Sequence, residues 1–436
     1  MIPPSRSPRL ASALVLFSFL LSCGMGNVPA EASDRHLASS RPASGPGQPP
    51  GPEDPIIPPT TKVVSLQEVT ADRAMTGAHR FSLSAGSPRI RGLRLGDVLV
   101  GGPTSFSPNG YLLKVVSVSR RRGQVEVQTR PASLTEAIQQ GSVEMSRALS
   151  GFEVRQSVEL EGVGLQTTTP TIQAIGLEVR LDRVVLADAD GDLNTTYDQV
   201  VANGRVHLDP SLSLKLRIRD FEVEEFSFIS ETRETSDLEL ITSVDLVDYH
   251  VRQEVARYTF APIVVWVGTV PVVFTPVLAV HVGLDGTVTV GMTTSVSQQA
   301  TITAGATYAG GVWSPVSEIT PNFYFSPPTL SAMARVAAYS GPQLSLMVYG
   351  VAGPYTQTRS YLELVADPFQ VPWWQLFGGL RGQVGVKVEI LGRLLASYEA
   401  TLFDQKWLLA EAEGGFPIIA TETPQPTLEP VLEPAS

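Results

Sequence analysis

Residues 278–296, LAVHVGLDGTVTVGMTTSV, carry the clearest indication of the fold. Leu278 to Leu284 and Thr287 to Val296 have the alternating or β-branched character of strands, and Asp285-Gly286 stands between them. Asp-Gly fits the type I′ turn that joins two antiparallel strands. The stretch therefore predicts a β-hairpin.

The same character continues on the C-terminal side of this hairpin. Leu344 to Val351, Gln357 to Val365 and Gly382 to Leu391 resemble further strands, and turn signals recur about every ten residues. A helical period returns only at Asp404 to Glu413. Residues 151–416 are therefore predicted to form one large antiparallel β domain, either a β-sandwich or a barrel-like fold.

A long apolar segment precedes and overlaps the hairpin. No Asp, Glu, Lys or Arg occurs from Tyr258 to Leu284, so Ala261 to Val282 is apolar enough to suggest a membrane helix. Pro262, Pro271 and Pro276 interrupt this segment and Val dominates it, which favours buried strands instead.

A smaller β domain is expected at residues 61–150. Its predicted strands are Lys62 to Val69, Arg89 to Val100, Tyr111 to Ser119 and Gln124 to Arg130. Ser133 and Glu136 have the spacing of a capping box and predict a short helix. The stretches GDVLVGG (96–102), GYLLKVVSV (110–118) and VEVQTRPASLTEAI (125–138) resemble a module of β-rich secreted bacterial proteins of unassigned function. This resemblance implies a fold and a context but no activity.

The N-terminus has the three parts of an export signal. Arg6 and Arg9 are followed by the uncharged run Leu10 to Leu21, which is short for a membrane span. Leu20-Leu21-Ser22-Cys23-Gly24 then resembles the lipobox of bacterial lipoproteins. The resemblance implies that residues 1–22 are a signal peptide and that Cys23 is acylated. Because Gly24 is not Asp, it also implies anchoring at the outer membrane, facing either the periplasm or the exterior.

Cys23 is the only cysteine of the 436 residues, so the sequence excludes an internal disulfide and a cysteine-based metal site. Residues 23–60, rich in Pro and Gly, are predicted to be a tether, and residues 417–436 a disordered acidic tail. The net charge of −11 argues against a nucleic-acid partner, since phosphate binding needs clustered Lys and Arg.

One loop has the composition of a calcium site. Asp188, Asp190, Asp192 and Asn194 place oxygen ligands at alternate positions, and Asp198 can complete the shell. Calcium takes six to eight oxygen ligands, which such loops supply. The first five residues are similar to the start of an EF-hand or dockerin calcium loop.

This loop departs from the EF-hand pattern at two positions. Leu193 stands where the pattern has Gly, and Gln199 stands where it has an acidic ligand. The flanking segments also have strand rather than helix character. A solvated turn is therefore the alternative to a calcium site, because Asp and Gly favour turns.

An acidic stretch runs from Asp209 to Glu254 and carries a net charge of −7. Asp237, Glu239 and Asp245 share one strand face, which is typical of a solvated sheet surface. The alternative is the carboxylate pair of a polysaccharide hydrolase. No paired-histidine zinc motif, nucleophile elbow or phosphate loop is present, so no catalytic residues are assigned and the chain is not expected to be an enzyme.

The leading hypothesis is thus a membrane-anchored lipoprotein with a non-enzymatic binding or structural role at the cell envelope. An envelope protein or a polysaccharide is the expected partner. Two alternatives stay open: the hydrolase, using acids from Asp237 to Glu254, and a carrier whose strands from Ala261 to Val312 line an apolar cavity.

Overall fold

The computed structural model describes residues 54–64, 80–84, 88–105, 107–121, 123–167, 176–188, 190–242, 246–288, 293–325, 334–386 and 398–415. The predicted signal peptide, Cys23, most of the tether and the tail at 417–436 lie outside these residues. The described residues all belong to one unit, Pro50–Ser436. No helix among them is both long enough and apolar enough to cross a membrane.

The first sheet along the chain has five strands in the order β1-β3-β4-β5-β2. Its strands are β1 (Thr61–Val63), β2 (Arg80–Ser84), β3 (Val98–Gly101), β4 (Tyr111–Arg121) and β5 (Gln124–Pro131), with helices α1 (Pro88–Arg91) and α2 (Leu134–Ala137). The helix predicted after Ser133 is confirmed as α2, and Ser133 N donates to Glu136 Oε2 at 3.1 Å. The strand predicted over Arg89 to Val100 is confirmed only from Val98 to Val100, because α1 extends to Arg91 and turns follow it.

The seven-stranded sheet has the order β16-β15-β11-β10-β9-β8, with β6 paired to β10. Its strands are β6 (Gly141–Ala148), β8 (Val163–Thr167), β9 (Leu177–Asp188), β10 (Gln199–Arg219), β11 (Glu222–Thr242), β15 (Thr293–Ala309) and β16 (Val312–Phe325). Asp220 and Phe221, both with positive φ, join β10 to β11, as a tight hairpin turn requires.

The eight-stranded sheet has the order β20-β19-β18-β17-β14-β12-β7, with β13 paired to β14. Its strands are β7 (Val154–Glu159), β12 (Leu246–Phe260), β13 (Ile263–Val267), β14 (Val270–Val288), β17 (Ala334–Val348), β18 (Pro354–Ala366), β19 (Trp374–Val386) and β20 (Tyr398–Glu411). A 3₁₀ turn at Gly151–Glu153 precedes β7.

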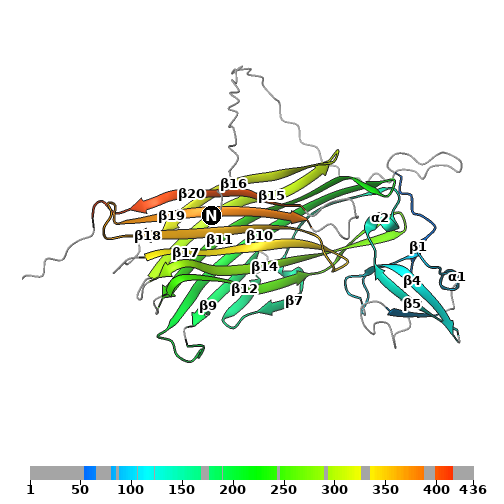
Figure 1. Ribbon diagram of the computed structural model, residues 1–436, viewed down its shortest axis with the longest axis horizontal. Helices are drawn as coiled ribbons and strands as arrows, with labels where there is room; N and C mark the ends of the chain where they lie inside the picture. The colour runs from blue at the N-terminus through cyan, green and yellow to red at the C-terminus, as the bar shows by residue number, and fades with distance from the viewer. Residues whose placement is uncertain are drawn as a thin grey trace, which may run out of the picture. The chain divides into compact units, whose positions relative to one another are not determined.

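The two larger sheets form an antiparallel β-sandwich, which resolves the choice that the sequence left open (Figure 1). Facing contacts join β16 to β20, β15 to β18 and β19, and β9 to β12 and β14. Side chains of alternate residues fill the space between the sheets, for example Leu208 and Leu214 of β10, Phe228 of β11 and Val280 of β14. The all-β fold class is therefore confirmed.

The hairpin predicted at Asp285-Gly286 is wrong. Both residues lie inside β14, where Asp285 is opposite His250 of β12 on one side and Ala337 of β17 on the other. The residues after Val288 lead to β15, which belongs to the other large sheet. Pairing on both sides of β14 thus overrides a local turn preference, and Gly286 adopts the positive φ within the strand.

The apolar segment forms β13, a two-residue turn and β14, as the strand interpretation predicts. The first part of β14 is buried on both faces: Val272 and Val273 are both fully buried. The β3–β4 loop covers one of these faces, where Thr275 Oγ1 donates to Asn109 Oδ1 at 2.9 Å. This double covering explains why the segment lacks charges.

The helical period expected at Asp404 to Glu413 is also wrong, because these residues belong to β20 or follow it. β20 is an edge strand and pairs only with β19 among the described strands. Lys406 of this edge strand donates to Glu363 at 2.7 Å, and Arg381 lies 3.8 Å from Asp404. Side-chain pairs between strands therefore stabilise this segment as a strand, despite its helical sequence pattern.

Candidate functional site

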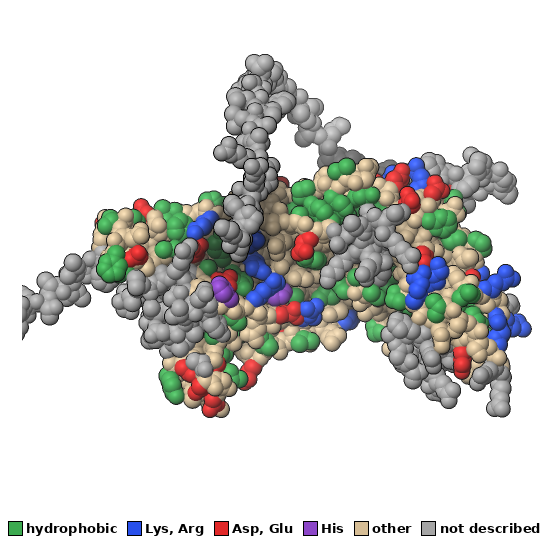
Figure 2. Space-filling view, in the orientation of Figure 1, with side chains coloured by type: hydrophobic (Ala, Val, Ile, Leu, Met, Phe, Trp, Pro, Cys, Tyr) green, Lys and Arg blue, Asp and Glu red, His purple; other side chains and the backbone are tan. Residues whose placement is uncertain are grey.

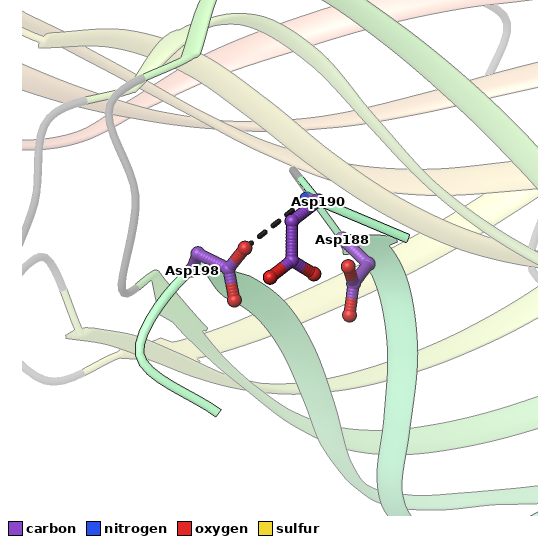
Figure 3. Close-up of side chains that lie close together, drawn as sticks. All are labelled: Asp188, Asp190 and Asp198. Carbon is purple, nitrogen blue, oxygen red and sulfur yellow. Dashed lines mark hydrogen bonds between the residues drawn. The ribbon is translucent and has the colours of Figure 1, made fainter. Parts of the chain in front are cut away.

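The acidic loop connects β9 to β10 and starts where Asp188 ends β9. Figure 3 shows Asp188, Asp190 and Asp198 turned toward one another. One carboxylate oxygen from each lies within 4.8 Å of the others. Asp198 is buried and the other two are more exposed. None of the three has an ion pair with Lys or Arg among the described residues, so their negative charge is not neutralised by a described side chain.

Hydrogen bonds from the chain hold this loop in place. Gly191 N donates to Asp188 Oδ1 at 2.7 Å, and Asp190 N donates to Asp198 Oδ2 at 3.1 Å. Thr195 Oγ1 lies within hydrogen-bond distance of both Asp190 and Asp198. Such side-chain bonds to nearby N–H groups are typical of tight turns, and they orient the carboxylates.

The structure brings together three of the four aspartates that the sequence singles out, Asp188, Asp190 and Asp198. Asp192 is not part of the group, since its Oδ1 accepts from the backbone and side-chain nitrogens of Asn194. The side chain of Gln199, at the position where an EF-hand has an acidic ligand, donates to Asp188 Oδ2 at 2.8 Å. The loop can therefore offer carboxylate oxygens to one hard cation, but it does so in its own arrangement rather than that of an EF-hand.

A groove of about 560 Å³ lies beside the acidic loop. Leu193 lines it from the loop, Gln199 from the start of β10, Asp182 and Arg183 from β9, and Gly162 from the β7–β8 turn. Ligand pockets usually have volumes of roughly 300–1,000 Å³, so the groove has the size of a binding site. Gln199 links it to the acidic group, because its amide also donates to Asp188.

The backbone around the groove is irregular. Arg183 has a φ of 52°, which is uncommon for a residue other than Gly, and its N–H donates to Asn203 Oδ1 at 2.8 Å. The pairing of β9 with β10 shifts register twice, between Val200 and Val201 and between Ala202 and Gly204. Bulges and strained residues of this kind often occur next to binding sites, because they redirect side chains.

A polar seam lies between the two large sheets, in the middle of the sandwich. We use this name for Ser230, Thr232, Glu234 and Ser236 of β11 with Thr356, Thr358 and Ser360 of β18, all of which are buried. Ser230 Oγ and Thr356 Oγ1 are 2.7 Å apart, and Ser360 Oγ donates to Glu234 Oε1 at 3.2 Å. The seam thus joins the sheets by hydrogen bonds where most of the interior is apolar.

Glu234 is the unusual member of this seam. It is 1% exposed, and its Oε2 has no hydrogen-bond partner. Burial raises the pKa of Glu234 to about 7, although the hydrogen bond from Ser360 acts in the opposite direction. A cavity of about 30 Å³ beside Ser360 and Ser340 has room for roughly two water molecules.

Sequence reasoning missed Glu234 because it lies in the acidic stretch assigned to a solvated face. Strand alternation could have located Glu234. It is an even number of residues from Phe228 and Leu238, so its side chain should point to the same, inner face of the strand. The predicted outward orientation of Asp237 is correct, because Asp237 forms a surface ion pair with Arg205 at 2.8 Å.

The acids that a hydrolase would use are distributed over both sheets. Asp237 and Glu239 belong to β11 of the seven-stranded sheet, whereas Glu254 belongs to β12 of the eight-stranded sheet, where it binds Arg257. Asp245 lies outside the described residues. The strands proposed to line an apolar cavity contribute Val272, Val280 and their neighbours to the packed core.

Comparisons with known proteins identify no relative: no protein-family model, no curated protein and no solved structure matches the chain.

Proposed function

We propose that the protein is a bacterial lipoprotein, anchored to the outer membrane through acylated Cys23, with a non-enzymatic binding role at the cell envelope. The lipobox-like residues around Cys23, the absence of other cysteines and the Pro-rich tether support this proposal. The tether is long enough to hold the folded body away from the lipid surface, since Pro-rich chain extends about 3 Å per residue.

The groove beside the acidic loop is the proposed binding site, and its form is the observation that carries the binding role. It has the volume of a ligand pocket, and its walls combine charged and amide side chains with Leu193 and Val184. A polysaccharide offers both hydroxyl groups and apolar ring faces, so this mixed lining suits an envelope polysaccharide.

Blocking the groove is expected to weaken the binding of an uncharged polysaccharide. Thr196 is exposed and lines the groove, so Thr196→Trp would fill it. Binding of a purified, uncharged envelope polysaccharide to soluble protein should fall about tenfold or more, which corresponds to the loss of roughly 1.4 kcal/mol. The matched control is Thr301→Trp, at an exposed position of β15. Equal affinity in the two variants would exclude the groove as the site.

We further propose that the acidic loop binds calcium, with Asp188, Asp190 and Asp198 as ligands. The proximity of their oxygens and the lack of a described basic partner support it, because a cation would relieve the repulsion among the three carboxylates. Calcium at the loop would also stabilise the wall of the groove through Gln199, which is bonded to Asp188.

Calcium is therefore expected to raise the melting temperature of the protein. At a free concentration 100 times the Kd, binding adds about 2.7 kcal/mol to the free energy of unfolding. Thermal melting with calcium and with a chelator measures this effect. Asp190→Asn should remove the difference, whereas Asp404→Asn, an exposed position on β20, should retain it. An identical midpoint of the unmodified protein under both conditions would refute calcium binding.

A further inference from the structure

A group of nitrogen-bearing side chains lies on the outer face of the eight-stranded sheet, where β12, β14, β17 and β18 are neighbours. The register places Arg252 opposite Gly283, which is opposite Tyr339 in turn. In the next row His281 is opposite Gly341. Successive side chains of a strand point to opposite faces, so these residues point away from the core that Val282 and Ser340 enter.

Gln357 and Arg359 of β18 complete this group. They alternate along the strand with Thr358 and Ser360, which belong to the polar seam and point inward. Gln357 and Arg359 therefore also point outward. We call Arg252, His281, Gln357 and Arg359 the donor patch. Figure 2 shows basic and histidine side chains gathered on this face over β12 and β14.

Three nitrogen atoms of the donor patch are buried without a hydrogen-bond partner: His281 Nδ1, Gln357 Nε2 and Arg359 Nε. His281 is 9% exposed and Gln357 is 5% exposed. Native proteins rarely leave such atoms unpaired. Their concentration on one face of neighbouring strands indicates a missing acceptor rather than three separate defects.

The charge of the donor patch also points to an acceptor with negative charge. Arg257 is bonded to Glu254 through two nitrogens, at 2.7 and 2.6 Å, whereas Arg252 and Arg359 form no ion pair among the described residues. Burial and the nearby Arg359 lower the pKa of Arg252. Two guanidinium groups thus lie near each other, and neither forms an ion pair with a described carboxylate, although the charge of Glu254 acts on Arg252.

The other acids near the donor patch already have partners. Asp285 lies 3.1 Å from His250 Nδ1, and Glu254 is bonded to Arg257 and lies 3.7 Å from His281 Nε2. Burial, and after it the charge of Arg252, lower the pKa of His281 to about 4. His281 is therefore neutral at pH 7 and can donate one hydrogen bond without adding charge.

Tyrosine rings lie flat on the same outer face. Tyr339, Tyr361 and Tyr355 each occupy the space in which a side chain would stand at a glycine of the adjacent strand, namely Gly283, Gly379 and Gly385 in that order. The Arg359 guanidinium lies over the ring of Tyr339, 5.1 Å from the ring centroid. Tyr361 and Tyr355 are partly exposed, so they present ring faces to solvent next to the donor patch.

We propose that this face binds an acidic polysaccharide, with a sugar carboxylate held by the donor patch and sugar rings stacked on Tyr361 and Tyr355. A guanidinium group matches a carboxylate with two parallel hydrogen bonds, and amide and imidazole N–H groups can satisfy its remaining lone pairs. The flat tyrosines favour a sugar over a free anion. This site is separate from the groove and does not depend on it.

Binding of an oligosaccharide of glucuronate tests the proposal. The soluble full-length Cys23→Ser protein should bind this probe, and the same oligosaccharide with its carboxylates reduced to alcohols should bind about tenfold more weakly or not at all. Arg359→Gln should cause a similar loss. The matched control is Arg155→Gln, at an exposed arginine of β7 in the same sheet, and it should leave the affinity unchanged.

The outcomes separate this site from its alternatives. Thr196→Trp, which blocks the groove, should not alter glucuronate binding, so failure of one site is distinguishable from failure of the other. If Arg359→Gln bound the oligosaccharide as tightly as the parent protein, the proposal would be overturned. Circular dichroism should show that both proteins are folded. Inorganic phosphate that binds as tightly as the oligosaccharide would overturn the role of the sugar rings. Tyr361→Ala tests those rings directly and should weaken binding of the oligosaccharide but not of phosphate.

Discussion

Replacing Cys23 with Ser is expected to move the protein from the membrane fraction to the soluble fraction. Each buried CH₂ of an acyl chain contributes roughly 0.8 kcal/mol, so the several chains of a lipoprotein anchor hold stably where a single chain is marginal. Cys23 is the only cysteine, so no second thiol can be acylated in its place. The variant should therefore lose its attachment completely while the folded body, which begins after the tether, stays intact.

Fractionation followed by a carbonate wash measures this release. Gly24→Asp is the matched control, because it keeps Cys23 and changes only the adjacent residue that the lipobox resemblance connects with sorting. It should remain in the membrane fraction but shift to the inner membrane. A Cys23→Ser protein that resists the wash would show that the folded body itself holds the membrane, and the lipid-anchor proposal would have to be abandoned.

Glu234→Gln is expected to stabilise the protein at pH 8 by about 3 kcal/mol and to have little effect near pH 4. Burial raises the pKa of Glu234 from 4.5 to about 7 in the folded state. The folded protein therefore holds this proton more tightly than the unfolded chain does. Stability from this group is complete below pH 4.5 and is lost as the pH rises to about 7, whereas a glutamine stays neutral throughout.

Urea unfolding at several pH values measures the difference between the two proteins. The hydrogen bond that Ser360 donates to Glu234 Oε1 can be kept by the amide oxygen, so the substitution changes mainly the charge. Glu231→Gln, at an exposed position of the same strand, is the control and should follow the parent protein. If the stability difference between Glu234→Gln and the parent protein did not vary with pH, the carboxyl would not be titrating in the folded interior.

Strand content and burial could be predicted from the sequence, because both follow from local patterns. Two local patterns identified strands before their partners were known: the alternation along β18 and the uncharged residues of β13 and β14. The capping pattern at Ser133 located α2 for the same reason. These signals need only neighbours within a few residues.

The acidic loop shows where local patterns become insufficient. Its composition and the alternate spacing of oxygen ligands pointed to the segment in which three carboxylates lie close together. The structure decides that Asp188, Asp190 and Asp198 converge while Asp192 bonds to Asn194, because backbone N–H groups compete for the same carboxylates. The groove beside it was not predictable, since its walls come from strands and turns that are far apart in the sequence.

The sequence by itself determined that this chain is an antiparallel β protein with one cysteine and an apolar segment that forms strands, and it predicts an export signal. The tertiary structure alone decided which strands pair, and it turned Asp285-Gly286 from a predicted turn into the interior of β14. It also placed Glu234 opposite Ser360, which is 126 residues away. The physical reason is that a turn preference is a local energy, whereas strand pairing on both sides and burial between two sheets sum over many distant contacts and outweigh it.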